Sequence, residues 1–408
     1  MTLPHTLLAV TSAAAGIVAV LGCVQAIVGA VLLHRFGRRA AAARQHPVSP
    51  SVPALPAVTV LKPLHGDEPM LYDALASFCA QDYPVMQIVF GVQSRTDAAI
   101  ALVERLQARF PALDLVLVTD LTTHGANRKV ANLINMLPHA RHDVLVISDS
   151  DIHAEPSYLR RVVEALARPG IGLVTTLYGG QPASLTLPRR LGASQVNHNF
   201  LPGVLMSRLL GRQDCLGATM ALRRQTLEDI GGLHALSPHI ADDSALGQLV
   251  RAGGQSIAIA DSMTVTTVAE LSLRDLFAHE LRWGRTVRSV EPLGYAASAI
   301  QLPLFWATVA VLLMPFAGWS WLALAVVWVI RGLTAGLIDR MVHSVPGGPR
   351  GTVSFPLLPL RDWMSAIVML GSFTGRRVAW RGQTLHLPAR VLLTPVHRQL
   401  APGVDAGD

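Results

Sequence analysis

The sequence predicts an α/β protein in which a mostly parallel sheet is preceded and followed by membrane-spanning helices. Of the 408 residues, 51% are hydrophobic and only 15% are charged, with a mean hydropathy of +0.40. This composition is too apolar for an ordinary soluble enzyme. The apolar residues are concentrated in residues 7–33 and 296–373, whereas residues 56–288 have the mixed composition of a globular domain. Within that domain, short apolar runs alternate with helix-like runs.

The first apolar segment predicts a membrane anchor in residues 1–34. Residues 7–33 exceed the roughly 20 residues needed to cross a bilayer, and no basic region precedes them, so we expect an uncleaved anchor. Arginines follow at once, at positions 35, 38, 39 and 44. By the positive-inside rule they place the N-terminus outside and the next domain in the cytoplasm. Residues 35–55 are expected to form a basic and proline-rich linker. Its stiff part is residues 46–56, with prolines at 47, 50, 53 and 56.

Residues 56–294 are predicted to form the globular domain. We expect strands at 58–61, 88–92, 115–118, 144–147 and 172–176, and helices at 70–81, 98–109, 129–137 and 156–166. Strands that alternate with helices indicate a largely parallel sheet covered by helices. The sequence has neither a Gly-x-Gly-x-x-Gly motif after the first strand nor a Walker motif, which disfavours a dinucleotide enzyme or a P-loop NTPase.

The C-terminal part predicts further membrane segments. Residues 295–339 read as a spanning hairpin of two helices, 300–317 and 319–338, that turns at Gly318. Arg331 lies deep in the second helix, where a cation either snorkels to the surface or faces a protein partner. Residues 340–408 are expected to contain a re-entrant or interfacial segment at 357–373 and a basic tail, because basic residues at both ends of that segment disfavour a full span.

Two carboxylates end the predicted strand at 144–147. Asp149 and Asp151 lie two residues apart, so in an extended segment they project to the same side. In an open α/β sheet, ligands bind beyond the carboxyl ends of the strands. Carboxylate oxygens are suitable ligands for Mg²⁺ or Mn²⁺, and these ions commonly bind together with phosphates. The expected ligand is therefore a nucleoside diphosphate. The alternative is a solvated loop or a helix N-cap.

Cysteine content and net charge limit the other partners. Three scattered cysteines indicate neither a disulfide framework nor a zinc site. The net charge of +7 could attract nucleic acid, but the arginines gather near the ends of apolar segments. This placement fits an anionic membrane face, and we expect no nucleic-acid partner.

Six short stretches in the same order carry a resemblance to a known family. They are 62–69 (KPLHGDEP), 97–100 (DAAI), 127–132 (NRKVAN), 148–151 (SDSD), 241–243 (ADD) and 279–283 (HELRW). Together they resemble the ceramide glucosyltransferase family, a branch of the GT-A glycosyltransferases, over about residues 58–294. Stretches 61–66 (LKPLHG), 132–138 (NLINMLP) and 279–285 (HELRWGR) are most similar to the bacterial enzymes of hopanoid biosynthesis.

The resemblance implies a GT-A fold and an inverting transfer from a UDP-sugar to a membrane lipid. The expected reaction moves N-acetylglucosamine from UDP-N-acetylglucosamine to bacteriohopanetetrol, at the bacterial inner membrane, in a multi-pass protein with a cytoplasmic catalytic domain. Transfer of glucose from UDP-glucose to ceramide is the alternative. A processive polysaccharide synthase would need more spanning helices and a Gln at position 279. A non-catalytic scaffold would be expected to have lost a carboxylate.

On the donor side, the resemblance assigns Asp97 to the uridine, although Asp97 could equally cap the helix that follows. Asp149 is expected to approach the ribose and the metal, and Asp151 to be the direct metal ligand. His198 aligns with a histidine near the donor, or else has a structural role. Lys129 could contact phosphate, or simply begin a solvated helix.

On the acceptor side, Asp243 matches the family's third acidic position and is the expected general base, with Asp242 as the alternative. Both could instead begin a helix at 244–251. Helix 273–288 would place His279, Arg282 and Trp283 on one face. Arg282 is expected to bind the diphosphate and Trp283 to form an apolar floor for the acceptor. His279 replaces the family's usual Gln or Arg, so its role stays open. A basic stripe of Arg282, Arg285 and Arg288 could also rest on anionic headgroups.

Overall fold

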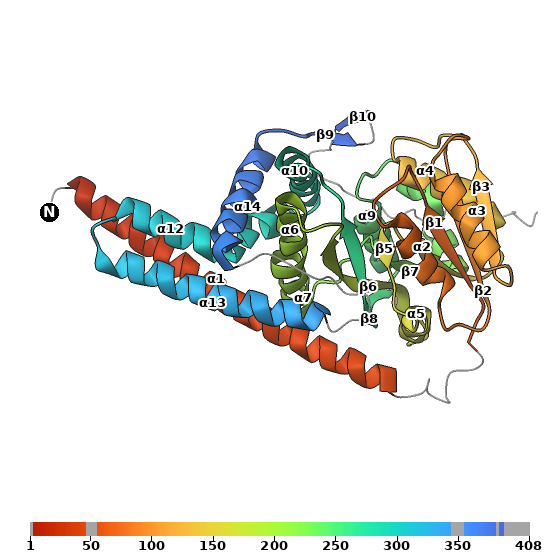
Figure 1. The fold of residues 1–408 in the computed structure, drawn as a ribbon, viewed down its shortest axis with the longest axis horizontal. Helices are drawn as coiled ribbons and strands as arrows, with labels where there is room; N and C mark the ends of the chain where they lie inside the picture. The colour runs from red at the N-terminus through yellow and green to blue at the C-terminus, as the bar shows by residue number, and fades with distance from the viewer. Residues whose placement is uncertain (1–2, 46–54, 344–354, 381–382, 387–408) are drawn as a thin grey trace, which may run out of the picture.

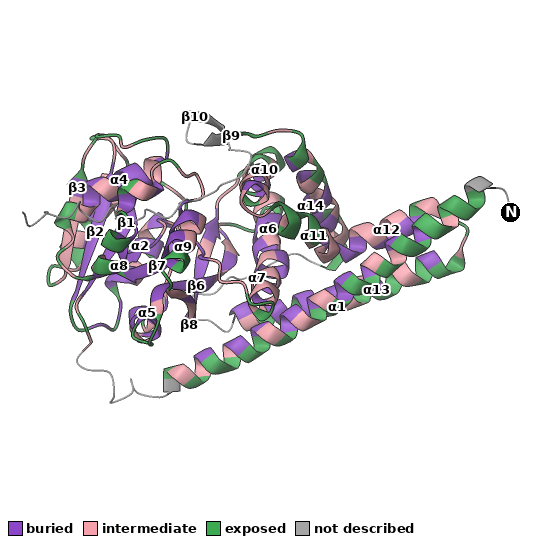
Figure 2. Cartoon of the chain, turned by 180° about the vertical axis from the view of Figure 1, so that it is seen from behind, coloured by how far each residue is buried: buried purple, intermediate pink, exposed green. Residues whose placement is uncertain are grey.

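An α/β domain and a long helical arm make up the protein (Figure 1). The computed structural model describes residues 3–45, 55–343, 355–380 and 383–386. The arm consists of α1 (Leu3–Gln45), α12 (Pro303–Leu313) and α13 (Gly318–His343), which pack side by side and extend away from the domain. Much of their outer surface is exposed (Figure 2). The described helices and strands therefore separate an apolar arm from a globular domain, as the hydropathy pattern predicts.

The domain is built on an eight-stranded mixed sheet. Its strands are β1 (Val58–Pro63), β2 (Met86–Val92), β3 (Asp114–Thr119), β4 (Val144–Ile147), β5 (Ile152–His153), β6 (Ile171–Pro182), β7 (Met220–Arg223) and β8 (Ser256–Val268). They lie in the order β3-β2-β1-β4-β7-β6-β8-β5. The first four strands are parallel, β7 is antiparallel to β4 and β6, and β5 is antiparallel to β8.

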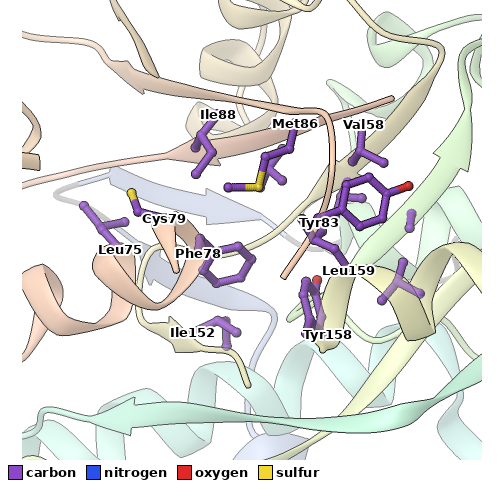
Figure 3. Packing of buried hydrophobic residues seen from close by; sticks show 14 of the residues in the cluster. Val58, Leu75, Phe78, Cys79, Tyr83, Met86, Ile88, Ile152, Tyr158 and Leu159 are labelled. Atoms are coloured by element: carbon purple, nitrogen blue, oxygen red, sulfur yellow. The ribbon is translucent and has the colours of Figure 1, made fainter. Parts of the chain in front are cut away.

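Alternating side chains give the sheet two buried faces. Val58 and Val60 of β1 pack on one face beneath α2 (Leu71–Cys79), α3 (Ala99–Arg109) and α5 (Tyr158–Leu166). Leu61 packs on the other face beneath α4 (Arg128–Met136) and α9 (Asp242–Ala252). Figure 3 shows the first face, where Phe78 meets Tyr158 edge-on with ring centroids 5.4 Å apart. Because both faces are covered, the strands read as continuous apolar runs in the sequence.

A second group of helices joins the domain to the arm. They are α6 (Leu187–Ser194), a π-helical turn (Gln195–Phe200), α7 (Leu201–Leu209), α10 (Leu273–Val290), α11 (Pro292–Ala297) and α14 (Leu358–Phe373). The last part of α1 packs with α7 against β6 and β8, burying Leu33 and Phe36. Some elements lie outside this group. Helix α8 (Arg224–Asp229) follows β7, and strand β9 (Arg377–Trp380) pairs with β10 (Gln383–His386) after α14. The sheet is thus in direct contact with the base of the arm.

The predicted strands and helices agree with the structure in position, with boundaries that shift by a few residues; β4 matches at both ends. Strands β5, β7 and β8 were missing from the prediction. Each of these strands is antiparallel to at least one neighbouring strand. A pattern of parallel strands that alternate with helices therefore does not predict them. The expected linker at 35–55 is wrong for residues 35–45, which continue α1 without a break. The prolines at 47, 50 and 53 lie outside the described residues.

Among the described residues, two helices are long and apolar enough to cross a membrane, residues 5–44 and 318–342. The first limb of the predicted hairpin is bent: residues 292–301 and 303–313 meet at 69°. Gly318 begins α13, as expected for the turn. Helix α14 covers the segment predicted to be re-entrant or interfacial, and it packs against α10 and α12.

Arg331 faces the protein and does not snorkel. Its side chain is 1% exposed, and Nη1 donates to the carbonyl of His198 at 3.1 Å. Nη2 donates to Asn199 Oδ1 and lies 3.6 Å from Asp362 Oδ1. Because a charge in an apolar region must be paired, these contacts fix α13 against the π-helical turn and α14.

A second buried ion pair joins α10 to α14. Arg361 Nη1 and Nη2 donate to the two carboxylate oxygens of Glu280 at 2.8 and 2.6 Å. The guanidinium also donates to the carbonyl of Leu191 and to Ser365. Both ion-pair side chains are nearly inaccessible, so neither charge can be solvated by water if the other is removed.

We expect Glu280→Leu to destabilise the protein by about 3–5 kcal/mol, because it leaves a buried guanidinium without its counterion. Chemical unfolding of the full chain in detergent measures this loss. The double variant Glu280→Leu/Arg361→Leu should lose less than Glu280→Leu alone, since no charge is then left unpaired. As a control, breaking the surface pair of Arg141 and Asp114 should cost about 0–1 kcal/mol. Equal losses in the single and double variants would contradict the assignment.

Candidate active site

Lys129 joins the end of a strand to the start of a helix on the other side of the site. Its ammonium lies 2.7 Å from Asp149 Oδ1, just beyond β4, and 3.2 Å from Asp242 Oδ2, in the first turn of α9. Burial opposes the charge on the lysine, but the two carboxylates raise the pKa of Lys129 above its usual value. The structure therefore brings together the two acidic motifs, 148–151 and 241–243, that lie far apart in the sequence.

Asn127 holds this arrangement in place from the start of α4. Its Oδ1 accepts from the backbone N–H of Val130, which is an N-cap. Its Nδ2 donates to the carbonyl of His239 at 2.8 Å and lies 3.4 Å from Asp242 Oδ1. Capping thus fixes the first turn of α4, from which Lys129 extends. The sequence motif 127–132 contains this cap, but its link to Asp242 could not be seen without the fold.

Asp151 is held by the far side of the sheet. Thr266 of β8 donates a hydrogen bond to Asp151 Oδ2 through Oγ1, and the backbone N–H of Thr267 donates to the Asp151 carbonyl at 3.2 Å. Burial raises the pKa of Asp151 to about 7, and the charges of Asp149 and Glu68 add to this rise. A divalent cation beside this carboxylate would favour its ionised form. Nothing in the sequence near Thr266 signals its role.

Lys62 lies behind the two aspartates. It is fully buried, with Nζ 3.5 Å from the centroid of the Phe78 ring. The ammonium donates to Ser148 Oγ at 3.2 Å and to the carbonyl of Asp149 at 2.7 Å. Burial lowers the pKa of Lys62 to about 7, against the charges of Asp151 and Asp149. Lys62 therefore fixes the backbone that carries the acidic pair, a role that the sequence motif did not reveal.

Asp97 serves as a cap and pins a neighbouring loop. Its Oδ1 accepts from the backbone N–H groups of Ala99 and Gly66, each at 2.9 Å. The first bond caps α3, and the second holds the loop after β1, where Gly66 has a φ of 71°. His65 Nδ1 lies 3.8 Å from Asp97 Oδ2. The capping role is confirmed, while contact with a uridine stays a prediction.

The two adjacent aspartates at the start of α9 have different surroundings. Asp242 is held by Lys129 and Asn127. Asp243 Oδ1 accepts from the backbone N–H of Ser244 at 2.7 Å, and its Oδ2 faces Gly217, where a Cβ would lie 3.2 Å away. Burial and the charge of Asp242 raise the pKa of Asp243 to about 6, against the opposing charge of Lys129. Both residues do begin a helix, and they also belong to the acidic cluster.

Tyr178 of β6 forms part of the wall around the same cluster. Burial raises the pKa of Tyr178, and the charges of Asp243 and Asp149 add to the rise. The ring packs against Phe200 with centroids 4.6 Å apart. This contact connects the carboxylates to the apolar layer between the sheet and α1.

His279, Arg282 and Trp283 gather around Glu270 at the start of α10. His279 Nδ1 is hydrogen-bonded to Glu270 Oε1, and the His279 and Trp283 rings meet edge-on with centroids 4.3 Å apart. Burial works against the charge of Glu270, but the His279 bond and the Arg282 guanidinium hold the pKa of Glu270 below its usual value. Trp283 is 39% exposed. Glu270 follows two residues after the end of β8, the strand whose Thr266 is bonded to Asp151, so a short segment connects the two clusters. No motif in the sequence points to Glu270.

Arg285 and Arg288 are engaged by the chain after α14. Arg285 donates to the carbonyl of Arg377 at 2.6 Å, and Arg288 to that of Gly375 at 2.8 Å. Arg288 also lies over the Phe373 ring, 5.3 Å from its centroid. The predicted stripe that includes these two residues therefore holds the C-terminal segment onto α10.

His198 braces helices. Its side chain is 0% exposed. Nδ1 bonds to Ser194 Oγ at 2.8 Å and Nε2 to Asp339 Oδ1 at 2.7 Å, which ties the π-helical turn to α13. Both ring nitrogens are engaged in these bonds. These contacts are those expected of the structural alternative, while a contact of His198 with the donor stays a prediction.

The acidic pair fits a metal site that a substrate would complete. Among the residues that the structure describes, no three His, Cys, Asp or Glu side chains converge as a ready-made metal centre. Mg²⁺ is commonly bound by one or two carboxylates together with substrate phosphates. Asp149, whose side chain is 37% exposed, and Asp151 supply such a pair of hard oxygen ligands at the carboxyl end of β4.

Comparison with known proteins gives a family match over most of the chain. The profile of "Glycosyl transferase family 21" matches residues 15–391. Ceramide glucosyltransferase 1 of Caenorhabditis elegans is 26% identical over 249 residues, covering 58% of this chain and 51% of that protein. The ceramide glucosyltransferase of Candida albicans is 31% identical over 121 residues, covering 27% and 22%. The chain spans about half the length, or less, of these curated relatives.

Two solved structures of glycosyltransferases align with the chain at low sequence identity. A mannosyltransferase from Pyrobaculum calidifontis, in complex with GDP-Man and Mn²⁺, is 19% identical with a TM-score of 0.47, covering 87% of this chain and 97% of that chain. Glucosyl-3-phosphoglycerate synthase from Mycobacterium tuberculosis is 17% identical with a TM-score of 0.39, covering 57% and 79%. The structure confirms the predicted α/β sheet covered by helices. The family match confirms the resemblance to ceramide glucosyltransferases. The closer similarity to hopanoid enzymes stays a prediction.

Proposed function

Since the chain belongs to glycosyl transferase family 21, we propose that it is an inverting hexosyltransferase that moves a sugar from a UDP-sugar to a hydroxyl of a membrane lipid. The observation that carries this proposal is the Lys129 bridge. It brings the strand-end pair at 149 and 151 together with the acidic pair at 242 and 243. One pair suits a metal and a diphosphate, and the other suits proton removal from an acceptor.

On the donor side, Asp149 and Asp151 would hold Mg²⁺ or Mn²⁺. Such a cation neutralises the charge that develops on the departing diphosphate. Lys62 and Thr266 keep the two carboxylates at the end of β4 and against β8. Lys129 and Arg282 are the cations proposed to approach the phosphates, and Asp97 the carboxylate nearest the uridine.

On the acceptor side, Asp243 is the proposed general base. Asp242 is already held by Lys129 and Asn127, whereas Asp243 Oδ2 lies beside Gly217, where no side chain fills the space next to it. A pKa of about 6 for Asp243 keeps most of the carboxylate ionised at neutral pH and makes it more basic than an ordinary aspartate. It takes the proton of the acceptor hydroxyl as that oxygen attacks the anomeric carbon opposite the diphosphate. An α-linked donor then gives a β-linked product.

The helical arm would keep the site near a membrane. Trp283, partly exposed beside His279, is the proposed apolar floor for the lipid, and His279 orients it through their ring contact. A lipid that diffuses in the membrane plane then needs only to present its hydroxyl to Asp243. The arginines after Leu33 favour a cytoplasmic catalytic domain at a bacterial inner membrane. Reporter fusions after Ser94 and Arg168 test this placement.

Two lipid acceptors are candidates. The curated relatives are ceramide glucosyltransferases, which favours transfer of glucose to a ceramide-like lipid. The stretches 61–66, 132–138 and 279–285 resemble the hopanoid enzymes, which supports transfer of N-acetylglucosamine to bacteriohopanetetrol as the second candidate. Both reactions use the same carboxylates and differ in the sugar pocket and the lipid groove.

We expect Asp243→Asn to retain UDP-sugar binding and to lose about 10² to 10⁴ in the rate of transfer, the usual contribution of a positioned base. Steady-state transfer and calorimetric UDP binding measure the two effects.

In the unmodified protein, the rate should fall as the pH drops below about 6, because protonation removes the base. Asp242→Asn is the matched control: it should leave measurable transfer and shift this acid limb to lower pH, since a charge that raises the Asp243 pKa is removed. Near-normal turnover of Asp243→Asn would move the role to Asp242.

Chelation tests the metal. Transfer should stop in EDTA and return with Mn²⁺ or Mg²⁺, and Asp151→Ala should abolish the metal-dependent part of UDP binding. Asp114→Ala, which removes a carboxylate from a surface ion pair, should leave both properties unchanged. Full activity in chelator would mean that fixed cations such as Arg282 neutralise the diphosphate.

Purified protein in detergent decides the substrates when it is incubated with UDP-glucose or UDP-N-acetylglucosamine and with ceramide or bacteriohopanetetrol. Mass spectrometry of the lipid products should find one glycosylated acceptor that is absent with Asp243→Asn. Glucosylceramide alone would select the ceramide reading, and a hexosaminyl hopanoid alone would select the second candidate. No glycosylated lipid from any pair, with both donors bound, would contradict a lipid transferase of either kind.

A further inference from the structure

A basic cavity lies between α1 and α7, where the anchor helix meets the catalytic domain. Its volume is about 570 Å³, within the range of small-ligand sites. Four arginines line it, Arg35, Arg38, Arg39 and Arg208, together with leucines that include Leu205 and Leu209. We call it the arginine pocket. In the described part of the chain, no acidic side chain lines the pocket.

Helical spacing explains why the positive charges converge. Arg35, Arg38 and Arg39 stand at positions i, i+3 and i+4 of α1, so they project from one face of the helix. All three are exposed. Across the residues that the structure describes, no carboxylate lies within ion-pair distance of any of them. Three neighbouring cations without counterions repel one another, and an anion between them would relieve that repulsion.

Arg208 closes the pocket from the side of α7. Its Nη1 donates to the carbonyl of Ile257 at 2.9 Å, and its Nη2 lies 3.3 Å from the carbonyl of Asp214. These bonds to backbone carbonyls hold the guanidinium in one position. The carboxylate that acts on its charge is that of Asp214, which already forms an ion pair with Arg212. One wall of the pocket is therefore a cation held by hydrogen bonds, and the opposite wall carries three exposed cations.

The position of the pocket along α1 favours a lipid over a soluble anion. The apolar part of α1 ends at Leu33, two residues before Arg35. Leu209 and Leu210, at the end of α7, are 61% and 78% exposed, which gives the rim an apolar surface. A free nucleotide or phosphate has no acyl chain to contact the leucines. A phospholipid can place its phosphate beside the cations and its acyl chains beside the leucines.

We propose that the arginine pocket binds the phosphate headgroup of an anionic membrane phospholipid, with its glycerol and acyl chains along the leucine rim. The occupant is distinct from the sugar donor, whose proposed site surrounds Lys129 and the aspartates. It is also distinct from a ceramide or hopanoid acceptor, which carries no negative charge for four arginines. Bound lipid would fix the base of α1 against α7, and thereby the domain against the membrane face.

Native mass spectrometry of the full-length protein, purified in detergent and titrated with short-chain phosphatidylglycerol or phosphatidylcholine, tests the proposal. Phosphatidylglycerol should bind about tenfold more tightly or better. The variant Arg35→Gln/Arg38→Gln/Arg39→Gln should lose most of this preference while its phosphatidylcholine binding stays unchanged. Replacing the same three arginines by lysine should retain most of it, because the charges remain.

A charge-matched control separates the pocket from net charge. The variant Arg105→Gln/Arg141→Gln/Arg168→Gln removes three exposed arginines from the catalytic domain, outside the pocket, and should bind phosphatidylglycerol like the unmodified protein. Equal loss in this control, or equal binding of both lipids by the unmodified protein, would overturn the proposal. Inorganic phosphate that binds as tightly as phosphatidylglycerol would also overturn it, since the pocket would then be a site for a free anion.

Discussion

The ion pairs of Lys129 are the interaction on which the site depends. Four carboxylates, Asp149, Asp151, Asp242 and Asp243, approach one another at one edge of the sheet, where burial and mutual repulsion both favour their neutral forms. The ammonium of Lys129 lies between the two pairs and offsets that repulsion. It also joins segments more than 90 residues apart in the chain. The capping of α4 by Asn127 matters for this reason, since it fixes the helical turn from which the lysine extends.

Much of the fold could be predicted because its signals are local. Parallel strands buried on both faces leave apolar runs, and β4 was predicted at both ends from its four apolar residues. The acidic motifs and the helix of Arg282 and Trp283 could likewise be found from spacing and resemblance. What could not be predicted depends on distant pairing. Strand β7 has only four residues and is defined by its partners β4 and β6, and the hydrogen bond of Thr266 to Asp151 exists because β8 lies beside β5.

Polar residues in apolar segments were ambiguous for a related reason. A charge such as Arg331 can reach the membrane surface or meet a protein group, and its own sequence neighbours are the same in both cases. The partners are His198, Asn199 and Asp362, which come from two other helices. The same fact explains His198: its neighbours in sequence suggest a functional histidine, but its contacts with Ser194 and Asp339 are those of a brace. Such polar contacts, with the pair of Arg361 and Glu280, hold α10 and the arm together.

Because α1 is one unbroken helix, its length fixes the distance between its two ends. At 1.5 Å per residue its 43 residues measure about 65 Å, roughly twice the hydrocarbon thickness of a bilayer. Near its end, Arg44 is bonded to Glu155 at 2.8 Å, and Glu155 also accepts from Ser262 of β8. The C-terminal end of α1 is therefore fixed to the sheet, and the length of the helix sets the distance from the sheet to its other end. In the proposed lipid transferase, the carboxylates would then stay at one distance from the lipid tails, and an acceptor would be selected by how far its hydroxyl protrudes as well as by its chemistry.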